Sequence, residues 1–318
     1  MWSPSAPLSA LRARAELYAA IRQFFAERGV LEVDTPVLSA AAVSDPHLDP
    51  LQSHFIGPGA PEGLPLYLQT SPEYAMKRLL AAGSGPIYQL AKAFRNGEAG
   101  RRHNPEFCML EWYRPGFDDR QLMDEVQALV AQVLGRDDFS RVSYRELFQR
   151  TLGIDPQRAS LPALQALAAE RLGVKFEDDE RDTWLQLLLA ELIEPTLITP
   201  TFVYDFPASQ AALAKVGEDA DGVAVARRFE LFVDGIELAN GYDELVDGDE
   251  QARRFAADAA QRLQLGKPAY SSDHNLVAAL RAGMPACAGV ALGVDRLLML
   301  ALGVDSIDQV LAFPIARA

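Results

Sequence analysis

Two carboxylates flank a short turn in the C-terminal half of the chain. Asp234-Gly235 lies between the runs 228–233 and 236–240, and Asp-Gly in that setting is a strong signal for a β-hairpin. The turn pairs position 232 with Glu237, which puts Glu230 and Glu237 on one face as diagonal neighbours ~7–8 Å apart. Two such carboxylates can hold a divalent metal ion that bridges phosphates. The alternative is an exposed acidic face, which like-charge repulsion mildly disfavours.

Cationic side chains gather in a polar loop, residues 96–105 (NGEAGRRHNP), between two strand-like segments. Arg95 ends the first segment, and Arg101, Arg102 and His103 crowd the loop. Guanidinium groups bind phosphate oxygens bidentately, so the cluster suits a polyphosphate. A solvated turn is the ordinary alternative, but an acidic chain that concentrates cations in one loop strengthens the first interpretation.

The strand-like segment 106–113 has one polar and one apolar face. A period of two puts Phe107, Glu111 and Tyr113 on the first face, and Leu110 and Trp112 on the second. The second face is an ordinary core face. The first is either a solvated face or one that presents a carboxylate and a phenol beside an aromatic ring.

The segment 289–296 combines glycines with an arginine. Gly293 would let the backbone pass close to a ligand. Arg296 falls on the first turn of the following helix, where the helix dipole does not stabilise a cation. A local conflict of this kind points to function, although helix packing is the common reason for such glycine spacing.

The elements that position these residues predict a mixed α/β, or α+β, fold. Strands are expected at 87–95, 106–113 and 201–205 and in the hairpin 228–240, joined without regularly alternating helices, which favours an antiparallel sheet flanked by helices. Helical patterns dominate from 120 to 193, as in an inserted subdomain. Residues 41–62 are rich in Pro, Gly and small residues and are expected to form a long connection.

Composition excludes several classes of protein. The 318 residues include 44 acidic and 30 basic ones, a formal net charge of −14, which argues against a broad nucleic-acid-binding surface. Cys108 and Cys287 cannot form a disulfide framework, and no zinc pattern surrounds them. The apolar stretch 285–304 contains two adjacent charges, which are too costly for a membrane span. A cytoplasmic protein without a membrane partner is expected.

Taken in order, these segments resemble the three motifs of a class II aminoacyl-tRNA synthetase core. FFAERGVLEVDTPVL (24–38) is similar to motif 1, FRNGEAGRRHNPEF (94–107) to motif 2 and GVALGVDRL (289–297) to motif 3. The stretches TSPEYAMKRLL, HNPEFCMLEWY and RFELFVDGIELANGYDEL resemble the lysyl branch. The resemblance covers nearly the whole chain.

The lysyl branch ordinarily carries an anticodon-binding domain before motif 1, and few residues precede that motif here. The chain therefore resembles the free-standing lysyl-synthetase paralogues that join (R)-β-lysine to elongation factor P. This resemblance implies one catalytic domain over residues 1–318 with a helical insertion at about 120–200, no anticodon-binding domain, a homodimer formed through motif 1, and no tRNA partner. The implied cofactors are ATP and Mg²⁺.

The resemblance also implies roles at a nucleotide site. Arg95 matches the motif 2 arginine that holds the α-phosphate and the substrate carboxylate, and with Arg296 it forms the expected catalytic pair. Phe107 matches the ring that stacks on adenine, with Arg296 over its other face. Glu230 and Glu237 match the metal-binding carboxylates. The expected ATP site comprises Arg95, Asn96, Gly97, Arg102, His103, Asn104, Phe107, Glu237, Leu238, Gly293 and Arg296.

The implied amino-acid site contains several polar groups. Glu73 matches the group that receives the amine near the carboxylate, and Glu111, Tyr113 and Glu244 match the groups that receive the side-chain ammonium. A substrate without that ammonium would leave buried carboxylates unpaired. The expected set is Ser71, Pro72, Glu73, Glu111, Tyr113, Asn240, Glu244 and Ala291.

Two departures from the synthetase pattern stand out. Motif 2 usually has a glutamate two places after its arginine, but here that place is Gly97 and the glutamate, Glu98, comes one residue later. Either the loop shifts by one residue or the backbone makes the contact. Ala291 replaces a glycine of lysyl-tRNA synthetases, and the added methyl group suits the shifted amine of β-lysine over lysine itself. One methyl group discriminates by only ~1–3 kcal/mol.

Two other functions compete with the protein-lysine ligase. One is a minimal aminoacyl-transferring enzyme that acts on RNA or on a small amine. A tRNA acceptor would give binding a steep salt dependence, which a protein acceptor need not show. The other is a non-catalytic, synthetase-like regulator, and the retention of Arg95, Phe107, Glu230, Glu237 and Arg296 argues against it.

Overall fold

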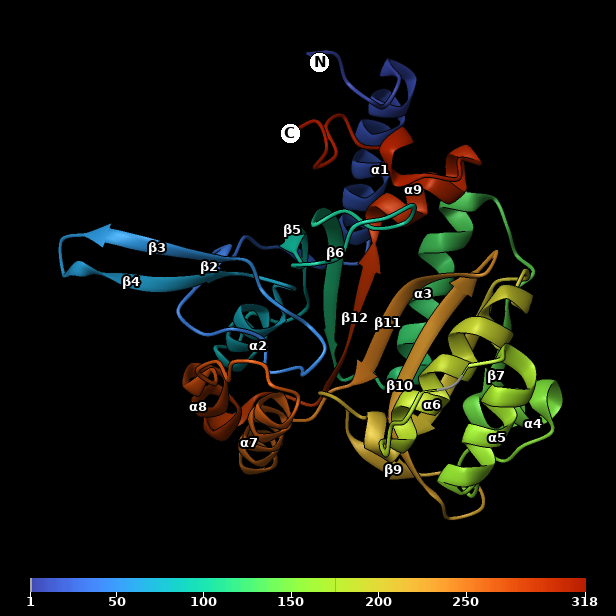
Figure 1. Cartoon of the computed structure of the whole chain (residues 1–318). Helices are drawn as coiled ribbons and strands as arrows, with labels where there is room; N and C mark the ends of the chain where they lie inside the picture. Colours follow the sequence, from blue (N-terminus) through green and yellow to red (C-terminus); the bar gives the residue numbers. More distant parts are fainter. Residues whose placement is uncertain (1, 175) are drawn as a thin grey trace.

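The strands that carry the predicted site lie side by side in one sheet (Figure 1). The computed structural model describes residues 2–174 and 176–318. Within these ranges the main sheet has nine strands, in the order β1-β5-β6-β12-β11-β10-β8-β7 with β9 paired to β10. The pairs from β5 to β8 are antiparallel, and the edge pairs β1·β5 and β7·β8 are parallel. The bounds are β1 (Leu31–Glu32), β5 (Ile87–Phe94), β6 (Glu106–Pro115), β12 (Cys287–Gly293), β11 (Ile236–Asp243), β10 (Ala224–Val233), β9 (Val216–Glu218), β8 (Thr201–Pro207) and β7 (Ser140–Ser143).

Helices cover one face of the sheet and one of its ends, which confirms the α+β fold. The helices α1 (Leu8–Ala26), α3 (Asp119–Leu134) and α9 (Val294–Leu302) share an apolar core with the sheet. A second group, α2 (Glu73–Ala81), α7 (Gly248–Gln264) and α8 (His274–Gly283), packs around the ends of β5, β6 and β12. The sheet face opposite the core is thereby left to form a cavity.

The segment predicted as a helical insertion divides between two cores. α3 packs against β10, β11 and β12 in the main core. By contrast, α4 (Tyr144–Leu152), α5 (Leu161–Leu172) and α6 (Arg181–Leu188) form a separate apolar cluster with β8, and they stand together beside β7 in Figure 1. Ser143 and Ser160 cap α4 and α5 by accepting backbone N–H groups, and Gly153 and Gly173 end these helices.

The prediction of a long irregular connection over 41–62 is wrong for its second half. Residues 52–57 form β3 (Gln52–Gly57), which pairs with β4 (Ala60–Leu68), and β2 (Leu38–Ser39) completes a small second sheet. This ribbon projects from the body in Figure 1. Its side chains, Phe55 and Ile56 among them, are largely exposed. A ribbon that buries neither face lacks the apolar alternation by which a strand is recognised.

The Asp-Gly turn closes the hairpin of β10 and β11 as predicted. Asp234 and Gly235 have φ angles of 50° and 69°, and a type I′ turn requires positive values at both positions. Beyond the first pairs a β-bulge leaves Leu238 without a partner, so Glu230 lies opposite Asn240. Glu237 therefore lies three residues along β11 from the partner of Glu230, where the predicted register would place it two residues away.

Candidate active site

One face of β6, β10, β11 and β12 and the loops around it enclose a cavity of about 970 Å³. The alternation predicted for β6 is confirmed, because Glu111 and Tyr113 line the cavity while Leu110 and Trp112 lie in the core. Most predicted site residues line this one cavity: Ser71, Glu73, Arg95, Arg102, His103, Asn104, Phe107, Glu111, Tyr113, Glu230, Glu237, Leu238, Asn240, Glu244, Ala291, Gly293 and Arg296.

Three predicted residues lie outside the cavity wall. Pro72 is the buried N-cap of α2. Asn96 is exposed, and its backbone N–H donates to the Asp49 carbonyl at 2.8 Å. Gly97 occupies the loop turn with a φ of 84°. In its place Glu98 lines the cavity, with its Oε1 3.8 Å from Nη1 of Arg95, so the loop presents the glutamate one position later.

The end of the cavity beside Phe107 contains a guanidinium with an unused donor. The Arg95 guanidinium lies 5.2 Å from the centroid of the Phe107 ring, and Arg95 Nε is buried without a hydrogen-bond partner. A buried charged donor without a partner is a position where a ligand oxygen can bind. Arg102 donates from Nη1 to the Gly235 carbonyl at 3.0 Å, which ties the cationic loop to the β10–β11 turn.

Arg296 lies in the first turn of α9, as predicted, and reaches across to the hairpin. Its Nη1 donates to the Glu237 carbonyl at 2.7 Å, and its Nη2 lies 2.7 Å from Nε2 of His103. Burial and the positive charge of Arg296 lower the pKa of His103, so the imidazole is neutral at pH 7.

Glu230 and Glu237 provide oxygen donors suited to Mg²⁺ at this end. Burial raises the pKa of Glu230 to about 7 despite its ion pair with Arg228, and the charge of Glu237 contributes to the rise. A divalent cation would relieve that repulsion. Within residues 2–174 and 176–318 no cluster of three or more His, Cys, Asp or Glu side chains could hold a metal. Two carboxylates alone do not complete the shell of a Mg²⁺, so phosphate oxygens and water would have to supply the remaining ligands.

The opposite end of the cavity is a buried network of acids. Glu111 accepts hydrogen bonds from the Ser71 hydroxyl at 2.6 Å and from the Tyr113 hydroxyl at 2.7 Å. Burial raises the pKa of Glu111 to about 8 and, despite an ion pair with Lys77, that of Glu244 to about 8. Such carboxylates favour a ligand that brings positive charge.

Gly289 leaves the space in which the side chains of Tyr113 and Glu244 meet. A Cβ atom on Gly289 would overlap both the Tyr113 ring and Oε1 of Glu244. Gly289 pairs with Tyr113 across β12 and β6, so the two side chains converge where the glycine leaves space. Ala291 lies two residues further along β12, opposite Glu111 and Asn240.

The residues that sequence reasoning missed at or beside this site include Lys77, Arg228 and Gly289. Lys77 follows Glu73 by four positions on α2, the helical spacing of an ion pair. Arg228 precedes Glu230 by two positions on β10, and its Nε donates to Oδ1 of Asn240 at 3.3 Å. Periodicity could have indicated both side chains. Nothing local distinguishes Gly289 from the other glycines of its segment.

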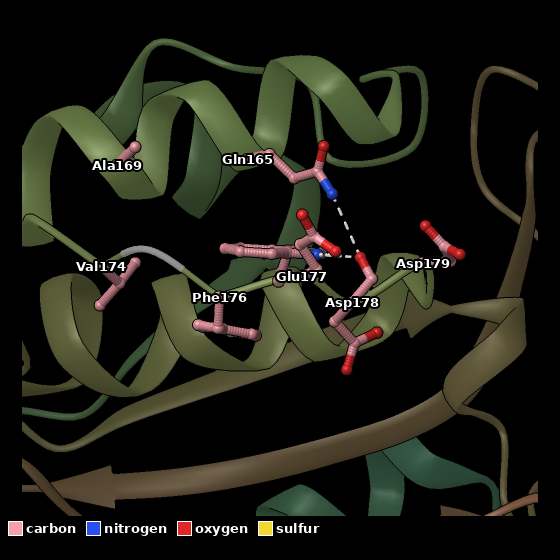
Figure 2. Close-up of a pocket in the computed structure, with 8 residues that line it drawn as sticks. Gln165, Ala169, Val174, Phe176, Glu177, Asp178 and Asp179 are labelled. Atoms are coloured by element: carbon pink, nitrogen blue, oxygen red, sulfur yellow. Dashed lines mark hydrogen bonds between the residues drawn. The ribbon is translucent and has the colours of Figure 1, made fainter.

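A second, smaller cavity of about 430 Å³ lies between α5 and α6 (Figure 2). Phe176 stacks on Trp184 with 4.4 Å between ring centroids, and Gln165 and Trp184 both donate to the Asp178 carbonyl. None of the predicted site residues lines it. Separately, no helix among the residues that the structure describes combines the length and hydropathy needed to cross a membrane.

Known proteins resemble this chain along its whole length. The model of the family "tRNA synthetases class II (D, K and N)" matches residues 5–317. Curated proteins named elongation factor P–(R)-β-lysine ligase are similar throughout. The one from Yersinia enterocolitica is 54% identical and the one from Vibrio cholerae 56%, each covering 100% of this chain and 98% of the relative. The one from Proteus mirabilis is 53% identical with the same coverage.

Proposed function

The chain belongs to the family of class II tRNA synthetases of the D, K and N type, and we propose that it is an ATP-dependent ligase that joins (R)-β-lysine to elongation factor P. The observation that carries this proposal is the geometry of the cavity. A group of acids lies at one end, with Glu111 and Glu244 buried and Glu73 half-buried, and Arg95 stands at the other end with a free donor. A diamino acid has ammonium groups for the first and a carboxylate for the second.

The first step joins the amino acid to AMP. A carboxylate oxygen of the substrate attacks the α-phosphorus of ATP, the bond to the bridging oxygen breaks, and pyrophosphate leaves. Arg95 binds the carboxylate and the α-phosphate and neutralises charge as the new bond forms. Arg296 and Arg102 hold the triphosphate, and Phe107 stacks on adenine. Bound Mg²⁺ would be held by Glu230 and Glu237 and would neutralise phosphate charge.

The second step transfers the acyl group. The ε-amine of an acceptor lysine attacks the adenylate carbonyl carbon, AMP leaves, and the nitrogen loses a proton as the amide forms. No enzyme nucleophile is required, in keeping with the burial of Cys108 and Cys287. We further propose a cytoplasmic homodimer that forms through the motif 1 segment and does not act on tRNA. The net charge of −14 and the exposed apolar side chains Leu31, Val37 and Leu38 support this view.

The test is the intact mass of purified elongation factor P after incubation with the enzyme, ATP, Mg²⁺ and (R)-β-lysine, with α-lysine in a parallel reaction. A gain of one lysyl unit, faster with the β isomer, is expected. If no mass is gained while pyrophosphate exchange proceeds, the adenylating site stands and the acceptor is another molecule. Absence of exchange with both amino acids would refute the proposal.

The metal assignment has its own test. Glu237→Ala removes one of the two carboxylates and should abolish ATP-dependent pyrophosphate exchange at all Mg²⁺ concentrations tested. Glu106→Ala is a matched control, because Glu106 is half-exposed and pairs with Lys92 away from the cavity. Unchanged exchange by Glu237→Ala would show that the metal is held elsewhere.

A further inference from the structure

Lys77 sits among the acids at the closed end of the cavity, and the proposed reaction gives it no role. It lies on α2, one turn after Glu73, and is 1% exposed. Its Nζ donates to Oε1 of Glu73 at 2.6 Å and lies 2.6 Å from Oε2 of Glu244. Glu73 belongs to α2 and Glu244 follows β11, and both carboxylates contact the same ammonium group.

The cluster contains one cation, Lys77, and three carboxylates. Burial alone would lower the pKa of Lys77, but the charges of Glu244 and Glu73 raise it above its usual value, so Lys77 stays cationic. Glu111 adds a third carboxylate, whose pKa the charge of Glu73 helps to raise. One ammonium against three carboxylates leaves two negative charges uncompensated when all groups are ionised. A diamino acid brings two ammonium groups to this end.

Without Lys77 the negative charges of the occupied site would outnumber its positive charges. Three carboxylates, two of them buried, would then face two ammonium groups, and breaking a buried ion pair is strongly destabilising because it leaves a charge without a partner. Glu73 and Glu244 would also repel each other at short range. Lys77 does not line the cavity, so it acts through these two carboxylates and not on the ligand.

We propose that Lys77 is a positioning residue that holds Glu73 and Glu244 together and cancels one of the three carboxylate charges, so that the site accepts two ammonium groups. The inference rests on the proposed function, because it takes a diamino acid as the substrate.

The first test is Lys77→Met, which keeps the length of the side chain and removes its charge. In pyrophosphate exchange the KM for (R)-β-lysine should rise at least about tenfold, while the KM for ATP stays within about twofold. Lys215→Met is the matched control. Lys215 also forms a lysine–carboxylate pair, with Asp243 at 2.6 Å, but Asp243 does not line the cavity, whereas Glu73 and Glu244 do, so both KM values should stay unchanged.

The second test separates charge from packing and does not depend on the stability of the methionine variant. Lys77→Ala removes the equivalent of n-propylammonium, and added n-propylammonium should restore β-lysine-dependent exchange and raise the Tm. The neutral 1-propanol, of similar size, should do neither. A KM of Lys77→Met like that of the wild type, or equal rescue by 1-propanol, would overturn the inference. Failure of the wild-type chain to exchange with (R)-β-lysine would instead refute the proposed function.

Discussion

The two ends of the cavity are proposed to bind groups of opposite charge, and they are built differently. At the amino-acid end, Glu111 and Glu244 are 2% and 1% exposed, and hydroxyl groups and Lys77 contact them. At the nucleotide end, the side chains of Arg296 and Glu237 are 23% and 41% exposed, and their charged atoms lie 3.6 Å apart. One end is thus enclosed by fixed neighbours, and the other is partly open to solvent.

This difference indicates how each end works. An exposed ion pair contributes only ~0–1 kcal/mol, whereas breaking a buried one costs ~3–5 kcal/mol. The buried end should therefore select among amino acids, because a ligand that lacks one ammonium leaves a carboxylate unpaired. The open end should bind and orient a larger anion that supplies much of its own charge.

The largest effect is expected at Arg95. Arg95→Ala removes the cation proposed to bind both the substrate carboxylate and the α-phosphate, so kcat for pyrophosphate exchange should fall about 10²–10³-fold. Arg101→Ala is the control on the same loop, because the Arg101 side chain is 63% exposed and pairs with Asp305. It should change the rate less than about twofold. Similar losses in both variants would assign the effect to the loop as a whole.

A methyl group at Gly289 should damage the amino-acid end selectively. Gly289→Ala forces Tyr113 and Glu244 apart, and overpacking of ~1–3 kcal/mol corresponds to a rise of about fivefold to 150-fold in the KM for (R)-β-lysine. The KM for ATP should not change. Gly100→Ala is a matched glycine in open space on the cationic loop. If Gly289→Ala raised the KM for ATP equally, the two ends would not be independent.

The amino-acid end should also respond to pH. With pKa values of about 8, Glu111 and Glu244 are mainly protonated at pH 6 in the free enzyme, and binding an ammonium group favours their ionised forms. Binding therefore releases protons, and affinity for (R)-β-lysine should rise about tenfold per pH unit for each proton released, until pH reaches about 8. Calorimetric titration between pH 6 and 8 measures this dependence. A flat profile would mean that the acids are already ionised.

The smallest effect is expected from Ala291→Gly. Ala291 faces the cavity between Glu111 and Asn240, so the change enlarges the site by one methyl group without altering its charge. The preference for (R)-β-lysine over α-lysine should weaken by about tenfold, because one methyl group discriminates by ~1–3 kcal/mol. The ratio of the two kcat/KM values measures the change. A constant ratio would exclude a role for this methyl group in selection.

Much of the site followed from local pattern. A period of two placed Glu111 and Tyr113 on one face of β6, and Asp234-Gly235 gave the hairpin that carries Glu230 and Glu237. Other features depend on context. The bulge at Leu238 was not predicted, because a register shift arises from packing across the sheet. In the projecting ribbon, β3 and the start of β4 were missed because the ribbon buries neither face, whereas the sequence predicted a strand over 64–69, the second half of β4.

By itself the sequence determined the kind of fold, the order of its motifs and, for strands such as β6, which side chains share the face that lines the cavity. These depend on residues a few positions apart, whose directions the strand and helix periods set. Only the tertiary structure decided that Lys77 joins Glu73 to Glu244, that Gly289 admits Tyr113, and that Arg95 keeps a buried donor without a partner. Each of these facts depends on distance and burial between segments far apart in the chain, which spacing along the sequence does not specify.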